Sequence, residues 1–160
     1  MFKPFEMSTI SSKVWKDSIL AETLGAVDEA NAFVGLAKNF SKKSEVKEIL
    51  REVQLVLFRI CANIAGFKNE TKDLELVTST INELEQKVER PKHFVILEKD
   101  VTTSALSVAR AVLRRAERRA VSLYRNGQID EKVVEILNKL NYLIYLLILY
   151  EGESFEEVKF

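Results

Sequence analysis

The chain has 160 residues, with 24 basic and 24 acidic side chains, so its formal net charge at pH 7 is zero. Without net positive charge it has no general attraction to nucleic acid or to an anionic membrane surface, and we expect neither partner. The length suits one domain, residues 1–160, with a real hydrophobic core. A lone cysteine, Cys61, excludes an internal disulfide and fits a reducing compartment, so we expect a cytoplasmic protein.

Apolar residues recur at steps of three and four in five segments, which predicts five helices. We expect these helices over residues 18–37, 44–65, 74–88, 104–125 and 131–150. Ser18 is a plausible N-cap of the first helix, and Asp130 caps the fifth. Gly66 ends the second helix, and Asn126-Gly127 ends the fourth.

The remaining segments have no helical period. Residues 1–17 are expected to be irregular, residues 38–44 to form a loop, and the run from Phe94 to Leu97 to be extended or irregular. The acidic tail, residues 152–160, is either loose or docked through its apolar side chains. With no convincing strand ladder and no internal repeat, the sequence predicts an all-α five-helix bundle.

The fifth predicted helix is apolar over most of its circumference, so it lies at the bundle centre or is covered by other subunits. Its longest apolar run, residues 143–150, is much shorter than the ~20 residues that span a bilayer.

Three arginines and a glutamate share one stripe of the fourth predicted helix: Arg110, Arg114, Glu117 and Arg118. A guanidinium cluster beside a core could hold a phosphate chain, because arginine presents paired donors to phosphate oxygens. The same spacing also fits a solvated helix face connected by ion pairs. The spacing alone leaves both interpretations open.

No metal site is expected. His93 is the only histidine and has no Cys, Asp or Glu constellation around it, so it is interpreted as a surface or loop residue. A di-iron bundle would need Glu-x-x-His pairs, and the sequence has none. Cys61 lies inside an apolar helical run and is most simply a small core residue.

Four blocks of the sequence have the residue types and spacing of one known family. They are KVWKD at 13–17 followed by GAVDEAN at 25–31, LREVQLVLF at 50–58, FVIL at 94–97 followed by ALSVARAVLRRAER at 105–118, and LNKL at 137–140. Together these blocks resemble the PduO-type ATP:cob(I)alamin adenosyltransferases, a family of trimeric five-helix bundles. The resemblance covers residues 13–150.

The resemblance implies transfer of the 5′-deoxyadenosyl group of ATP to the cobalt of cob(I)alamin, giving adenosylcobalamin and triphosphate. The reduced cobalt would be the nucleophile at C5′. ATP with Mg²⁺ and cobalamin are the implied substrates, and the implied assembly is a homotrimer. A corrinoid reductase and an adenosylcobalamin-dependent enzyme are the implied protein partners.

The resemblance also implies roles for individual residues on ATP. Arg114 matches a family arginine on the nucleotide, Lys16 matches a lysine on the phosphate side, and Glu117 and Asn138 match residues that position the nucleotide.

Three further residues match the family's catalytic positions. Arg110 matches an arginine that pairs with an aspartate, here Asp28, near the subunit boundary. Phe94 matches the aromatic residue that takes the place of the corrin's lower axial ligand, which makes the cobalt easier to reduce.

The chain also departs from the family pattern. Residues 1–12 contain no counterpart of the family's Gly-rich nucleotide loop, a cradle of backbone N–H groups for phosphates. The family's Pro-Gly-Gly turn is replaced within residues 97–100, Leu-Glu-Lys-Asp, and Ser107 stands for a histidine. Two alternatives to the enzyme therefore remain: a non-catalytic paralogue that carries or senses ATP or corrinoid, and a structural or interaction bundle.

Overall fold

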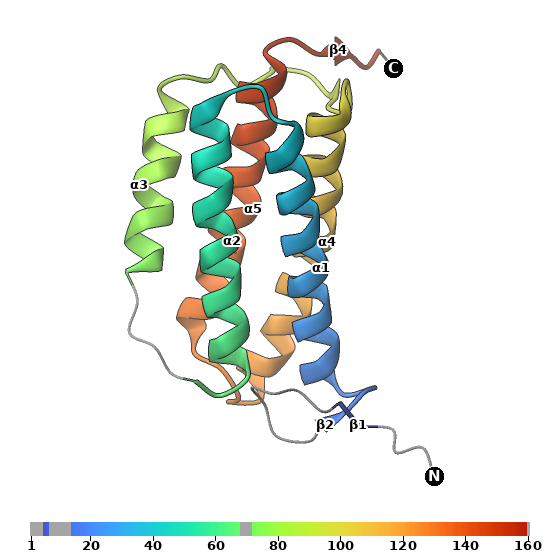
Figure 1. The fold of residues 1–160 in the computed structure, drawn as a ribbon, viewed down its shortest axis with the longest axis vertical. Helices are drawn as coiled ribbons and strands as arrows, with labels where there is room; N and C mark the ends of the chain where they lie inside the picture. The colour runs from blue at the N-terminus through green and yellow to red at the C-terminus, as the bar shows by residue number, and fades with distance from the viewer. Residues whose placement is uncertain (1–4, 7–13, 68–71, 160) are drawn as a thin grey trace.

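The computed structural model describes residues 5–6, 14–67 and 72–159. Five helices run side by side: α1 (Ile19–Phe40), α2 (Ser44–Ile64), α3 (Asp73–Glu85), α4 (Val101–Arg125) and α5 (Glu131–Gly152) (Figure 1). The predicted all-α five-helix bundle is confirmed.

Two pairs of very short antiparallel strands accompany the helices. Strand β1 (Phe5–Glu6) pairs with β2 (Val14–Trp15), and β3 (Val95–Ile96) pairs with β4 (Glu156–Glu157). The β1–β2 pair lies at one end of the bundle and β4 at the other (Figure 1). The extended conformation expected near Phe94 is confirmed, whereas the pairing in the N-terminal segment and in the tail was not predicted.

The helix ends follow local hydrogen bonding. Ser18 caps α1 as predicted, since its Oγ accepts a hydrogen bond from the backbone N–H of Ala21 at 3.2 Å. The predicted loop over residues 38–44 is wrong in its first half, because α1 continues to Phe40. Lys38 stays helical and its Nζ donates to Gln54 Oε1 on α2 at 2.7 Å.

Helix α4 begins earlier than the apolar period indicates. Asp100 forms a capping box with Thr103: the Asp100 carboxylate accepts from the Thr103 backbone N–H at 2.8 Å, and Thr103 Oγ1 accepts from the Asp100 N–H at 3.0 Å. Helix α3 ends at Glu85, earlier than predicted, where the backbone N–H of Lys87 donates to the carbonyl of Leu84 and closes the last turn.

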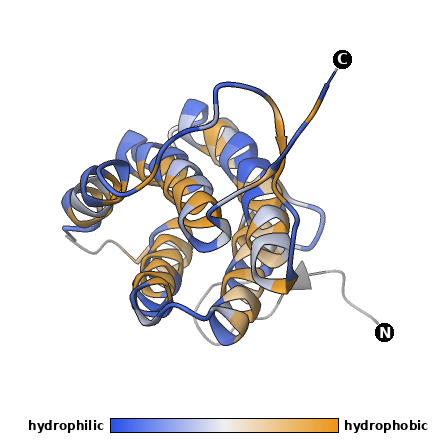
Figure 2. Cartoon of the chain, turned by 90° about the horizontal axis from the view of Figure 1, so that it is seen from above, coloured by the Kyte–Doolittle hydropathy of each residue, from blue (hydrophilic) through white to orange (hydrophobic). Residues whose placement is uncertain are grey.

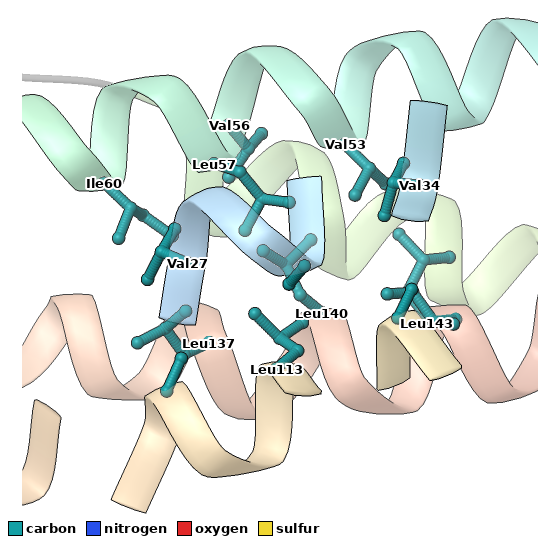
Figure 3. Packing of buried hydrophobic residues seen from close by; sticks show 14 of the residues in the cluster. Val27, Val34, Val53, Val56, Leu57, Ile60, Leu113, Leu137, Leu140 and Leu143 are labelled. Atoms are coloured by element: carbon teal, nitrogen blue, oxygen red, sulfur yellow. The ribbon is translucent and has the colours of Figure 1, made fainter. Parts of the chain in front are cut away.

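Helix α5 supplies much of the core. Viewed along the bundle, the hydrophobic parts of the helices face inward and the hydrophilic parts face outward (Figure 2). Leu137, Leu140 and Leu143 of α5 point toward Val27 and Val34 of α1 and toward the apolar face of α2 (Figure 3).

Within the described part of the chain, α5 alone is long and apolar enough to cross a membrane by length and composition, yet most of it is buried in the bundle.

Helix α1 packs antiparallel against α4. Arg119 pairs with Glu22 at 2.9 Å, and Arg115 pairs with Glu29, so the two helices run in opposite directions along their contact. The buried faces of both helices carry small residues, Ala26 and Ala30 on α1 and Ala109, Ala116 and Ala120 on α4. Small side chains let two helix backbones approach closely.

A bidentate ion pair attaches α3 to α2. The Nε and Nη2 atoms of Arg59 donate to the carboxylate of Asp73 at 2.7–3.0 Å, and the Asp73 side chain is 7% exposed. This hydrogen bonding raises the pKa of Arg59, so the guanidinium stays charged. Removing one partner of such a pair leaves the other charge partly desolvated.

We expect Asp73→Asn to lower the free energy of unfolding by about 2 kcal/mol, because Arg59 loses its counter-charge in a half-buried setting. Urea denaturation measures the loss. Glu22→Gln is the matched control: it removes the exposed Glu22–Arg119 pair, away from Arg59, and should cost less than about 1 kcal/mol. Equal losses in the two variants would contradict a special role for the Asp73 pair.

Candidate functional site

A carboxylate on α4 joins two amides on α5. Glu117 Oε1 accepts from Asn138 Nδ2 at 2.8 Å, and Glu117 Oε2 accepts from Asn141 Nδ2 at 2.6 Å. Asn141 is buried, whereas Asn138 is exposed. Both Glu117 oxygens therefore accept hydrogen bonds, and the bond from Asn138 fixes the orientation of that surface side chain.

Arg110 lies two turns before Glu117 on the same side of α4 and is half-buried. Its guanidinium carbon lies 5.3 Å from the centre of the Tyr145 ring of α5, a cation–π contact. Burial, and then the positive charge of Arg114, lower the pKa of Arg110. Its buried Nε has no hydrogen-bond partner, and none of the ion pairs found among the described residues includes it.

Arg114 lies one turn beyond Arg110 and is exposed. Arg110, Arg114, Glu117 and Asn138 thus lie together along the seam between α4 and α5, and we call these four residues the α4–α5 cluster. A half-buried arginine beside a second arginine, with no carboxylate pairing it in the described structure, favours an anion at this seam.

Asp28 lies elsewhere in the single chain. Its neighbour Glu29 pairs with Arg115 of α4, whereas Asp28, about 100° away round α1, lies near Cys61 of α2. Burial, and then the nearby charge of Asp28, raise the pKa of the Cys61 thiol on α2 to about 11. No Asp28–Arg110 ion pair forms within the described chain, and the pair stays a prediction for contact between subunits.

Lys16 and Phe94 also lie outside the cluster. Lys16 is exposed and lines a shallow hollow on the α1 side of α4, together with Arg115 and Arg119. Phe94 precedes β3, and its side chain is 75% exposed. The expected absence of a nucleotide loop in residues 1–12 falls largely on residues outside the described part of the chain.

The turn that replaces the family's Pro-Gly-Gly is held at each of its three charged residues. Glu98 accepts a hydrogen bond from the hydroxyl of Ser107, and Asp100 caps α4. Lys99 donates to the backbone carbonyls of Gly152 and Ser154. Ser107 is itself a departure from the family pattern, so two of the departures contact each other.

Sequence reasoning noted Asn141 as a polar interruption of the apolar fifth helix, gave it no role in the site, and missed Tyr145. They follow Asn138 at steps of three and four, which places all three on one face of α5. Polar residues at this spacing in an otherwise apolar helix were the available signal.

Comparison with known proteins decides the family. The cobalamin adenosyltransferase family model matches residues 7–151. The chain belongs to this family. The resemblance to cobalamin adenosyltransferases inferred from the four sequence blocks is thereby confirmed.

Individual cobalamin adenosyltransferases agree with this assignment. The chain is 30% identical over 142 residues to a corrinoid adenosyltransferase of Bacillus subtilis (strain 168), covering 82% of this chain and 74% of that one. It is 28% identical over 146 residues to a corrinoid adenosyltransferase of Citrobacter freundii, covering 84% and 81%. The fold matches a variant of the PduO-type ATP:corrinoid adenosyltransferase from Lactobacillus reuteri, complexed with cobalamin and ATP, with a TM-score of 0.83 at 25% identity over 93% and 91% of the two chains.

We expect Glu117→Ala to lower the free energy of unfolding by about 2 kcal/mol, because the buried Asn141 amide loses its acceptor. Glu117→Gln should cost less than about 1 kcal/mol, since rotation of the Asn141 amide brings its buried, unpaired Oδ1 to the new donor. Urea denaturation compares the two variants. Wild-type stability in Glu117→Ala would show that the carboxylate does not support Asn141.

Proposed function

We propose that the protein transfers the 5′-deoxyadenosyl group of ATP to the cobalt of cob(I)alamin, giving adenosylcobalamin and triphosphate. Family membership supports the reaction class, and relatives of the same fold bind ATP and cobalamin. The observation on this chain that carries the proposal is the cationic seam. Arg110 and Arg114 lie together beside Glu117, and burial destabilises the charge of Arg110 until an anion approaches.

The cluster suits a nucleoside triphosphate. Arg110 and Arg114 would bind phosphate oxygens, where a guanidinium makes paired hydrogen bonds. Asn138 donates its Nδ2 hydrogen to Glu117, which leaves Asn138 Oδ1 for a donor on the ligand, such as the adenine amino group or a ribose hydroxyl. Glu117 thus acts on the nucleotide mainly by orienting Asn138.

The reaction requires this chain to position C5′ of ATP over the cobalt and to neutralise the leaving triphosphate. Cobalt(I) attacks C5′ of ATP as a nucleophile, and the C5′–O bond breaks as triphosphate leaves with its negative charge. Arg110 and Arg114 would stabilise that charge as it develops, with Lys16 on the phosphate side. Phe94, with its exposed ring, would cover the lower axial face of the corrin.

We propose that Mg²⁺ arrives with the triphosphate. Among the described residues, no three His, Cys, Asp or Glu side chains group together as metal ligands, and both oxygens of Glu117 are engaged by amides. The phosphate oxygens of ATP are themselves the hard ligands that Mg²⁺ prefers.

We propose that the working unit is a homotrimer. Asp28 lies near Cys61 of α2, and Lys16 lines the hollow on the α1 side of α4, so both are outside the α4–α5 cluster; one subunit would contribute Asp28 and Lys16 and its neighbour the cluster. Large apolar side chains exposed on α1 and α2 support a subunit contact there: Leu36, Phe40 and Phe58 are 42–59% exposed.

The free cysteine and balanced charge support a cytoplasmic protein that binds neither nucleic acid nor membrane. Its proposed partners are a reductase that supplies cob(I)alamin and an enzyme that uses adenosylcobalamin.

The first test is adenosylcobalamin formation from ATP, Mg²⁺ and chemically reduced cob(I)alamin under anaerobic conditions. We expect Arg114→Ala to raise the KM for ATP at least tenfold, about 1.4 kcal/mol, because a phosphate contact is lost. Arg125→Ala, at the exposed end of α4, is the control and should leave the KM unchanged. Wild-type protein that binds ATP but forms no product would instead be a non-catalytic binding paralogue.

We expect Asp28→Asn to weaken the trimer or its ATP binding, because Arg110 loses the carboxylate of the neighbouring subunit. Sedimentation velocity measures the assembly, and equilibrium titration measures the binding. The control is Glu29→Gln, which removes only the Glu29–Arg115 pair inside one chain. Unaltered assembly and binding in Asp28→Asn would rule out the pair, and a monomeric wild-type protein would rule out the shared site.

A further inference from the structure

Residues 153–159 fold back over the end of the bundle after α5, and we call them the strap. Its first residue, Glu153, has φ of 64°, a left-handed conformation that is strained for a residue other than glycine. The Nζ of Lys43 holds Glu153 there, donating to its carboxylate at 2.8 Å and to the carbonyl of Tyr150 at 2.7 Å. The sharp exit from α5 is therefore maintained by specific contacts.

Contacts of Lys99 and of Phe155 fix the course of the strap. The Nζ of Lys99 donates to the carbonyls of Gly152 at 2.8 Å and Ser154 at 2.9 Å, and lies 5.8 Å from the centre of the Phe155 ring. The Phe155 ring packs directly on Gly152, where an added Cβ would lie 2.3 Å from its Cζ. Lys99 thus binds the carbonyls where the chain leaves α5, and Phe155 packs against the C-terminal end of α5.

Beyond this turn the strap reaches the segment that carries Phe94. Strand β4 pairs with β3, with Glu157 opposite Val95, and the N–H of Val158 donates to the carbonyl of Phe94 at 2.8 Å. The Phe94 side chain is largely exposed, and the strap holds its backbone next to the β3–β4 pair. Val95 from β3 and Phe155 and Glu157 from the strap line the same hollow of about 690 Å³.

Resting on the proposed function, we propose that Lys99 is a positioning residue for the corrinoid. By binding the Gly152 and Ser154 carbonyls, Lys99 holds the strap on β3 and so sets the position of Phe94 against the corrin. Lys99 stands within the turn that replaces the family's Pro-Gly-Gly, which gives this departure a function.

The test replaces Lys99 with Met, which has similar length but no donor. We expect Lys99→Met to speed hydrogen exchange at least fivefold in peptides covering 94–97 and 154–159. It should raise the KM for cob(I)alamin at least fivefold and leave the KM for ATP within twofold. Lys99→Arg keeps the donors and should restore both values, and Lys47→Met, an exposed lysine of α2, should change neither.

Two comparisons separate positioning from simple loss of stability. In a Phe94→Ala background, Lys99→Met should have no further effect on the KM for cob(I)alamin, because the residue it positions is gone. Gly152→Ala keeps the Lys99 side chain but displaces Phe155 from the end of α5, so it loosens the strap by a second route. Should Lys99→Met fail to fold, Gly152→Ala should show the same faster exchange and the same rise in the KM for cob(I)alamin.

Each failure has a distinct meaning. Unchanged hydrogen exchange in Lys99→Met would show that Lys99 does not hold the strap. Faster exchange with an unchanged KM for cob(I)alamin would show that the strap does not position Phe94. Were the wild-type protein to form no adenosylcobalamin, the proposed function would fail. The exchange measurement and the affinity for cob(II)alamin, followed by its visible absorption, would still decide the role of Lys99.

Discussion

Helix α4 is held along two of its faces, and the arrangement of the site depends on that constraint. Against α1 it packs through alanines flanked by the Glu22–Arg119 and Glu29–Arg115 pairs. Against α5 it is joined by Glu117 and by the contact of Arg110 with Tyr145. With two faces fixed, α4 cannot rotate to bury its remaining face, so Arg110 and Arg114 stay at the seam with α5.

The electrostatics of the seam follow from the same packing. Arg110 is close enough to the core to lose hydration, yet the ring of Tyr145 is the partner it finds on α5. A guanidinium in this setting is stabilised strongly by an arriving anion, while an exposed arginine gains little. With one arginine at the core boundary and the next in solvent, the proposed anion site would have both a strongly binding group and an accessible one.

Much of this arrangement could be predicted from the sequence, because it depends on local spacing. Helical periodicity located all five helices, and the four-residue step from Arg110 to Arg114 located the cationic stripe. Contacts between distant segments could not be found in this way. Nothing near Asn141 indicates that Glu117 is its partner, and the pairing of β4 with β3 depends on Lys99, which lies far from the strap in sequence. The proposed Asp28–Arg110 pair would require a second chain, which local spacing does not describe.

The hydrogen bond from Ser107 to Glu98 joins two positions at which this chain differs from the family pattern. Restoring Pro-Gly-Gly alone would remove the acceptor of the serine hydroxyl, and restoring histidine alone would place an imidazole against the Glu98 carboxylate. The two positions are therefore structurally coupled, and a change at one is tolerated only with a change at the other. In homologous chains they should change in concert, and a chimera should exchange them together.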